Sequence, residues 1–268
     1  MDKLDSGLAI RGDIAIKTAQ ASYCMNDYDF MRECRYEAFC SNPTVANYLR
    51  LFVDKESIEK YKGLAEKRIE DLSEPEKRHI MEYSYNYEFE SDYHYLQFFS
   101  GHFDKVVDRC KNQKASLGWT GTFIPHGIDL MLLYLYAEPH PKKAVKRIAD
   151  RVTNRIGFDK AKNLLFFKEN YIFEKDVSEQ EKGEIFWNTF LKWKENYWIP
   201  DHTLKEYVDW LEGVIDGRIH GIVGGKYRRK YEDTALLAAA IGEVKESLGE
   251  KLAKWDLLNK YMKEYSCY

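Results

Sequence analysis

The residues best suited to chemistry in this sequence are cations that recur along one predicted helix. They stand every four residues, at Lys143, Arg147, Arg151 and Arg155. A helix over 141–156 therefore places them in one stripe. A row of guanidinium groups suits phosphate or an acidic peptide, because arginine stays charged and can donate two hydrogen bonds to one oxyanion. The same spacing also fits a solvated face whose cations pair with acids on adjacent helices.

A second basic segment interleaves cations with an aromatic ring, at Lys226, Tyr227, Arg228 and Arg229. The periodicity that follows predicts a helix over 227–248. Cations at a helix N-terminus oppose the helix dipole. This conflict indicates either a binding partner or a helix that begins further along the chain.

A glycine-rich connector over 115–127 follows no period and carries Trp119 and His126. A large aromatic on such a connector either closes a groove or plugs the end of a hydrophobic layer. A third hypothesis is an enzyme that uses a pocket under this connector, with His126 as acid or base.

Motifs for catalysis, metal binding or phosphate binding are absent from the sequence. It contains no H-E-x-x-H, no G-x-S-x-G and no G-x-x-x-x-G-K, and its seven histidines are scattered. The five cysteines form no C-x-x-C pair, and their odd number argues against a disulfide framework. We therefore predict no catalytic residues, no metal and no cofactor.

The elements that must position these residues have helical periodicity. A first helix over about 10–25 places Ile14, Thr18, Ala19 and Ser22 on one face, and Asp27 is suited to cap the next helix. Residues 202–222 follow the 3.6-residue period closely. The one short alternation, over 83–89, fits helix or loop better than strand, since no strand partner is nearby. The predicted class is all-α.

Short turns between helices favour an array of antiparallel pairs, an α-solenoid, over a single bundle. We expect N-terminal helical repeats over 1–114, the connector over 115–127 and C-terminal repeats over 128–268. The two halves could also form one continuous array.

Two family resemblances support this architecture. Residues 12–45, with Ala19 and Ala38 at close-contact positions and Pro43 starting the next unit, resemble a tetratricopeptide repeat. The turn over 101–103 with Val106 resembles its continuation. The leucine and aromatic usual early in such a repeat are Thr18 and Ala15 here. This resemblance implies a right-handed superhelix.

The second resemblance covers more of the chain. The segments LGWTG (117–121), RIADRVTNRIGFD (147–159) and GGKYRRKYEDTALLAAAIGEV (224–244) resemble the helical C-terminal region of bacterial SWIM zinc-finger proteins. The zinc motif of that family needs C-x-C and C-x-H, and both are missing. The resemblance therefore implies the helical scaffold without zinc, and a chain that belongs to a longer protein.

Composition narrows the function further. A net charge of −3 provides no global basic field, and the longest apolar run, 130–137, is too short to span a membrane. The first residues do not resemble a signal peptide, so we expect a cytoplasmic protein. The predicted function is a protein-interaction scaffold that binds a protein or peptide through aromatic and basic side chains. The alternative is a nucleic-acid accessory module that uses the basic stripe. The oligomeric state is open.

Overall fold

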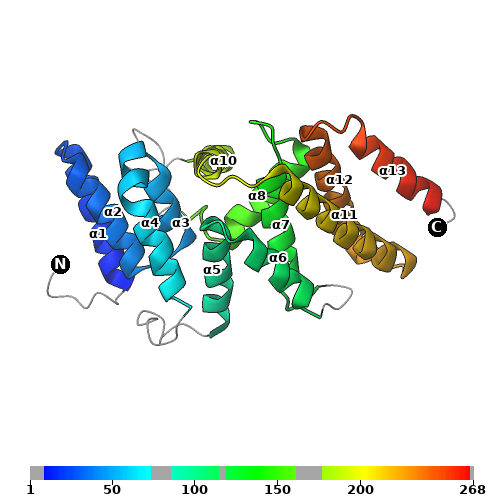
Figure 1. Ribbon diagram of the computed structural model, residues 1–268, viewed down its shortest axis with the longest axis horizontal. Helices are drawn as coiled ribbons and strands as arrows, with labels where there is room; N and C mark the ends of the chain where they lie inside the picture. The colour runs from blue at the N-terminus through cyan, green and yellow to red at the C-terminus, as the bar shows by residue number, and fades with distance from the viewer. Residues whose placement is uncertain (1–8, 74–85, 115–118, 161–176, 266–268) are drawn as a thin grey trace. The chain divides into compact units, whose positions relative to one another are not determined.

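The computed structural model describes residues 9–73, 86–114, 119–160 and 177–265, and every element within these ranges is a helix (Figure 1). This confirms the predicted all-α class. The segment 83–89 lies partly outside the described residues. The helices are, in chain order, α1 (Ala9–Cys24), α2 (Tyr28–Ser41), α3 (Val45–Leu49), the 3-10 turn η1 (Arg50–Phe52), α4 (Lys55–Asp71), α5 (Asn86–Phe99), α6 (Phe103–Asn112), α7 (Ile124–Leu135), α8 (Lys143–Arg155), α10 (Glu179–Lys194), α11 (Asp201–Gly224), the 3-10 turn η4 (Arg228–Lys230), α12 (Tyr231–Ser247) and α13 (Ala253–Glu264).

The chain forms two compact units that interleave along the sequence. Unit 1 comprises 1–105 and 153–197, and unit 2 comprises 106–152 and 198–268. Two of the three boundaries therefore fall inside α6 and α8, and the third lies between α10 and α11. The division that the sequence pattern placed within 115–127 stays a prediction. The connector is also shorter than predicted at its C-terminal end, because α7 begins at Ile124 with proline in its first turn.

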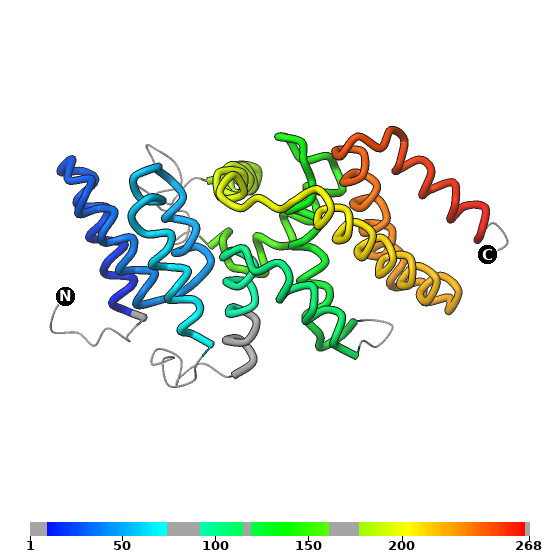
Figure 2. Tube along the Cα trace, in the orientation of Figure 1, coloured from blue at the N-terminus to red at the C-terminus, as the bar shows by residue number. Residues whose placement is uncertain are grey.

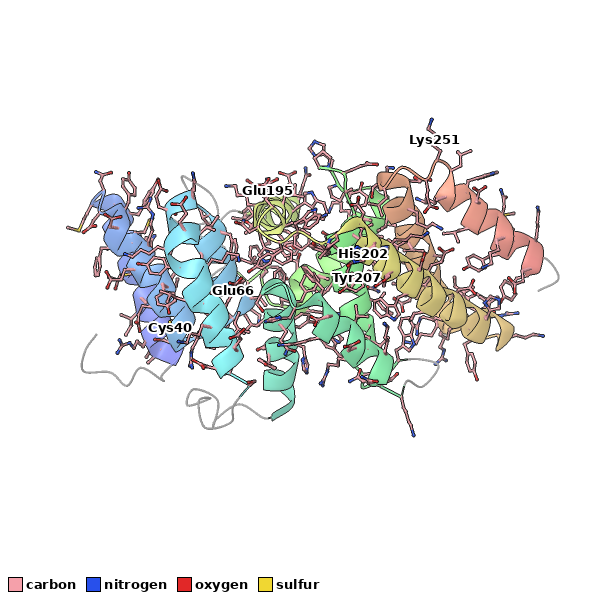
Figure 3. The ribbon with its side chains drawn as sticks, in the orientation of Figure 1. Cys40, Glu66, Glu195, His202, Tyr207 and Lys251 are labelled. Atoms are coloured by element: carbon pink, nitrogen blue, oxygen red, sulfur yellow. The ribbon has the colours of Figure 1, made fainter. Side chains whose placement is uncertain are left out.

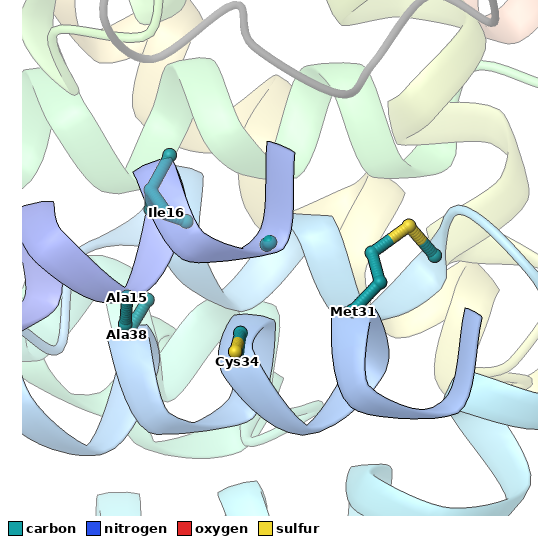
Figure 4. Packing of buried hydrophobic residues seen from close by; sticks show 6 residues of the cluster. Ala15, Ile16, Met31, Cys34 and Ala38 are labelled. Carbon is teal, nitrogen blue, oxygen red and sulfur yellow. The ribbon is translucent and has the colours of Figure 1, made fainter. Parts of the chain in front are cut away.

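In unit 1, α1 and α2 form a closely packed pair (Figure 4). Small and apolar residues fill the contact, namely Ala15, Ile16, Ala19, Met31, Cys34 and Ala38. A Cβ atom added to Gly12 would lie 2.9 Å from Cβ of Asn42, so the start of α1 lies against the end of α2. The two helices are therefore antiparallel.

The prediction for one residue of the α1 face, Ile14, was wrong. Ile14 is exposed, whereas Ala15 and Ala19 are fully buried. The small side chains of Ala15 and Ala19 let the two backbones approach, and Ile16 supplies the larger apolar side chain of this contact in place of Ile14. The predicted cap was right, because the Asp27 side chain accepts a hydrogen bond from the Phe30 amide at 3.1 Å.

The centre of unit 1 is aromatic. The indole of Trp193, on α10, is fully buried and donates a hydrogen bond to the Phe99 carbonyl at 2.6 Å. Its ring centroid lies 4.9 Å from Phe99 and 5.1 Å from Phe190. Tryptophan has a polar handle that needs a partner when buried, and here a backbone carbonyl supplies it.

Tyr197 closes the same unit by joining three elements. Its hydroxyl lies 2.6 Å from the Tyr48 hydroxyl and 2.7 Å from the carboxylate of Glu66, which is labelled on α4 in Figure 3. Burial raises the pKa of Tyr197, so the phenol stays protonated and donates to Glu66. Lys62 pairs with the same carboxylate at 2.7 Å.

In unit 2, α11 and α12 run antiparallel as a hairpin, and α13 follows α12 (Figure 2). The 3.6-residue period predicted over 202–222 corresponds to a face of α11 on which Val208, Leu211, Ile215 and Ile219 are buried, whereas Leu204 is only partly buried. Arg218, late in α11, pairs with Asp233, early in α12, and Glu212, in the middle of α11, pairs with Lys245, near the end of α12.

Candidate binding surface

The cations of α8 differ in their surroundings although they share one helix. Lys143 and Arg147 are exposed, whereas Arg151 and Arg155 are partly buried. The positive charges along this helix and just before it meet carboxylates in Lys142–Glu138, Lys142–Glu246, Lys146–Asp150, Arg147–Glu232, Arg151–Asp129 and Arg151–Asp233. Two of the four stripe residues, Arg147 and Arg151, are therefore paired with carboxylates of unit 2.

Arg151 lies at the centre of a small charge network. Its guanidinium is 2.5 Å from the fully buried carboxylate of Asp129 and 2.6 Å from Asp233. Burial alone would lower the pKa of Arg151, but the two carboxylates outweigh that effect and raise it. A buried carboxylate needs such a counter-ion, because an unpaired charge in the interior is costly.

Arg218 and Trp119 complete this network. Arg218 is buried and binds the second oxygen of Asp233 at 3.0 Å. The Trp119 ring covers its guanidinium, with Cζ 4.1 Å from the ring centroid. Trp119 is itself buried and has a positive φ of 56°. Its ring therefore packs on a cation inside unit 2, with two arginines balancing two aspartates beneath it.

His126 lies in the first turn of α7. Its ring stacks on Phe123 at a centroid distance of 5.7 Å and an interplanar angle of 11°. Phe123 is buried, and its backbone amide donates a hydrogen bond to the side-chain oxygen of Gln113, just after α6, at 2.7 Å. Trp119 and His126 therefore each pack on a neighbour within unit 2.

The second basic segment has a different environment. We call residues 226–230, which hold Lys226, Tyr227, Arg228, Arg229 and Lys230, the basic tip. All five are exposed. Within the described ranges, no carboxylate forms an ion pair with Arg228, Arg229 or Lys230. The tip therefore offers positive charge to an external anion.

The helix boundary explains how the tip tolerates this charge. The predicted helix over 227–248 begins later, at Tyr231, and the cations lie in the 3-10 turn η4 before it. The first turn of α12 carries Glu232 and Asp233, as the helix dipole favours. The conflict in the sequence thus came from a misplaced helix start.

The nearest acids in the chain are already engaged. Glu232 binds Arg147 at 2.8 Å, and Asp233 binds Arg151 and Arg218. These two carboxylates hold α8 and α11 against α12. The two acids that follow the tip in sequence are thus bound to Arg147, Arg151 and Arg218.

The network residues Asp129, Arg218 and Asp233 were missed in the sequence. The available signal was an aspartate inside the apolar run 128–135, because a buried carboxylate requires a cation nearby. The sequence could not show which cation would reach it.

Neither a metal site nor a membrane span is evident in the part of the chain that the structure describes. No three His, Cys, Asp or Glu side chains there lie together in a way that could hold a metal ion. No helix in those ranges is long and apolar enough to cross a bilayer.

Comparisons with known proteins give no relative: no family model, curated protein or solved structure matches this sequence. The tetratricopeptide-like and SWIM-associated resemblances therefore stay predictions.

Proposed function

We propose that this protein is an interaction scaffold, built from antiparallel helix pairs in a tetratricopeptide-like array, that holds an acidic segment of a partner protein on the basic tip. The observation that carries the proposal is the exposure of Arg228, Arg229 and Lys230, which form no ion pair with a carboxylate in the described parts of the chain. A helical hairpin anchored by partly buried ion pairs presents these residues, so the backbone that carries the binding groups is held in place before the partner arrives.

The chemistry of the tip favours a carboxylate-rich peptide. Arginine binds carboxylates with two parallel hydrogen bonds, and two adjacent arginines can take two acidic side chains. Tyr227, half exposed between the cations, adds an aromatic surface at low conformational cost. Lys143 and Trp119 were also candidate binding residues in the sequence. Trp119 is buried on Arg218, so it supports the charge network of Arg151, Arg218, Asp129 and Asp233.

The second candidate is a nucleic-acid accessory module. The four cations of the basic tip, Lys226, Arg228, Arg229 and Lys230, favour it as well. The two candidates differ in the expected dependence of binding on salt. Each phosphate that the protein neutralises releases counterions, so the affinity for nucleic acid falls steeply as the salt concentration rises. The net charge of −3 and the small size of the tip argue for the protein partner. The proposed scaffold catalyses no reaction.

The test is a pull-down from the source cell's lysate with three baits, each with nuclease-treated and untreated halves. The baits are the wild type, the tip variant R228E/R229E and the control K111E/K205E. The control reverses two exposed lysines elsewhere in unit 2 and carries the same net charge as the tip variant. We expect one protein to be retained by the wild type and the control after nuclease treatment, and at least about tenfold less of it on the tip variant.

Loss of all bound material after nuclease treatment would favour the nucleic-acid module instead. If all three baits retained equal amounts of the partner protein, the basic tip would not be its binding site and the proposal would be wrong. Reversal of Arg151 is not a suitable test, because that residue neutralises the buried Asp129.

A further inference from the structure

The last described helix, α13, has two apolar faces. One face carries Ala253 and Leu257, which are buried in unit 2. The other carries Trp255, Leu258 and Met262, which are 58%, 49% and 61% exposed. These three residues are spaced i, i+3 and i+7, so they form one stripe on the side of the helix opposite Leu257. An aligned row of large apolar residues differs from scattered exposed leucines, which are ordinary.

The helix cannot turn this stripe inward, because its other side is fixed by charged and close contacts. Lys254 Nζ lies 2.6 Å from the buried Glu243, and Lys260 Nζ lies 2.6 Å from Asp216. The Tyr261 hydroxyl donates to the same Asp216 at 2.8 Å. The stripe is therefore a stable feature of the outer surface of α13.

The backbone approach of α12 and α13 adds to this attachment. A Cβ atom added to Gly242 would lie 2.6 Å from Cα of Lys254, so a glycine is needed where the helices meet. His220 on α11 also binds Glu264 at 2.7 Å. Both ends of α13 are thus held to their neighbours.

Charged residues beside the stripe indicate what covers it. Asp256 follows Trp255 and Lys263 follows Met262, so both charges lie along the same edge of the stripe, one near each end of α13. When two such helices pack antiparallel, the same edge of each helix lies side by side, and the two edges run in opposite chain directions. Asp256 then faces the partner subunit's Lys263, and the symmetry repeats this pair. The same arrangement sets Trp255 beside the partner subunit's Met262, a favourable sulfur–aromatic contact.

We propose that this stripe binds a second copy of the chain, with α13 packed antiparallel against α13 of its partner about a two-fold axis. A two-fold contact uses the same surface on both copies, and one stripe with both charges on one edge is self-complementary. The proposal goes beyond the binding assigned to the basic tip, and neither depends on the other.

The expected association is weak. A helix of 12 residues is about 18 Å long, so the contact falls at the small end of specific interfaces. We expect a dissociation constant on the order of tens of micromolar, with monomer and dimer in fast exchange.

Sedimentation velocity on the purified full chain, over about 5 to 500 µM, tests the contact. Leu258→Lys is expected to weaken dimerisation at least tenfold. The matched control is Leu64→Lys on α4, because Leu64 is 50% exposed and Leu258 is 49% exposed. The control and R228E/R229E should dimerise like the wild type, and circular dichroism verifies that each variant is folded.

Charge reversal tests the antiparallel pairing. Asp256→Lys and Lys263→Asp are each expected to weaken the dimer about threefold to tenfold, and the double variant is expected to restore it. Restoration supports the pairing. A wild type that is monomeric throughout, an equal loss with Leu64→Lys, a species larger than a dimer, or failure of the double variant to restore association would overturn the proposal.

Discussion

At the scale of single residues, identical cations on one helix have different roles because their surroundings differ. Arg147 meets the exposed Glu232, so water screens the pair. Arg151, one turn further, meets the fully buried Asp129. Removal of Arg151 takes from the buried Asp129 a cation that lies 2.5 Å away, whereas removal of Arg147 leaves Glu232 in water.

This contrast predicts unequal losses of stability. Arg151→Ala should lower the free energy of unfolding by about 3–5 kcal/mol, as for other broken buried pairs. Arg147→Ala should lower it by less than about 1 kcal/mol. Urea unfolding followed by circular dichroism measures both values, and similar losses would show that Arg151 does not serve the buried charge.

At the scale of elements, α8 is capped by another helix. The amides of Ala144 and Val145 both donate to Glu243 of α12 at 2.9 Å, and Lys254 of α13 binds the other carboxylate oxygen. The first amides of a helix lack partners within it, and a carboxylate there also suits the dipole. One buried side chain therefore joins three helices of unit 2.

Glu243→Ala removes the cap and the partner of Lys254 together. We expect a loss of about 3 kcal/mol in unfolding free energy, because two amides and a partly buried ammonium lose their acceptor. The control is Glu250→Ala, which removes an exposed partner of Lys245 and should cost less than about 1 kcal/mol. Hydrogen exchange provides the local measurement: faster exchange at Ala144 and Val145 in the Glu243 variant alone is the expected result.

At the scale of the whole molecule, each compact unit is assembled from two separate stretches of chain. Unit 1 needs 153–197 because α10 supplies Phe190 and Trp193 to the aromatic centre around Phe99. Such a centre cannot form from the first stretch alone, since the fully buried rings of Phe190 and Trp193 would be missing.

A fragment of residues 1–114 should therefore lose cooperative unfolding. It lacks all of α10, so Phe98, Phe99 and Phe103 become exposed to water. Near-ultraviolet circular dichroism of the fragment should be weak, and its thermal transition broad or absent. A native-like aromatic signal with a sharp transition would show that the first stretch folds by itself.

The sequence by itself determined the local structure of the chain. The 3.6-residue period predicts α11, and a cap such as Asp27 works through atoms only a few residues apart. The basic tip was also visible, because its cations are contiguous. These features depend on short-range interactions, which a sequence displays directly.

The tertiary structure alone decided which charges remain available for binding. Arg151 and Arg228 are equally basic in sequence, but Arg151 is paired with Asp129 and Asp233, 22 and 82 residues away, and Arg228 is not. The grouping of 1–105 with 153–197 likewise depends on contacts between distant segments. The physical reason is that burial and counter-ions are properties of packed surfaces, and no periodicity along the chain specifies which distant surfaces meet.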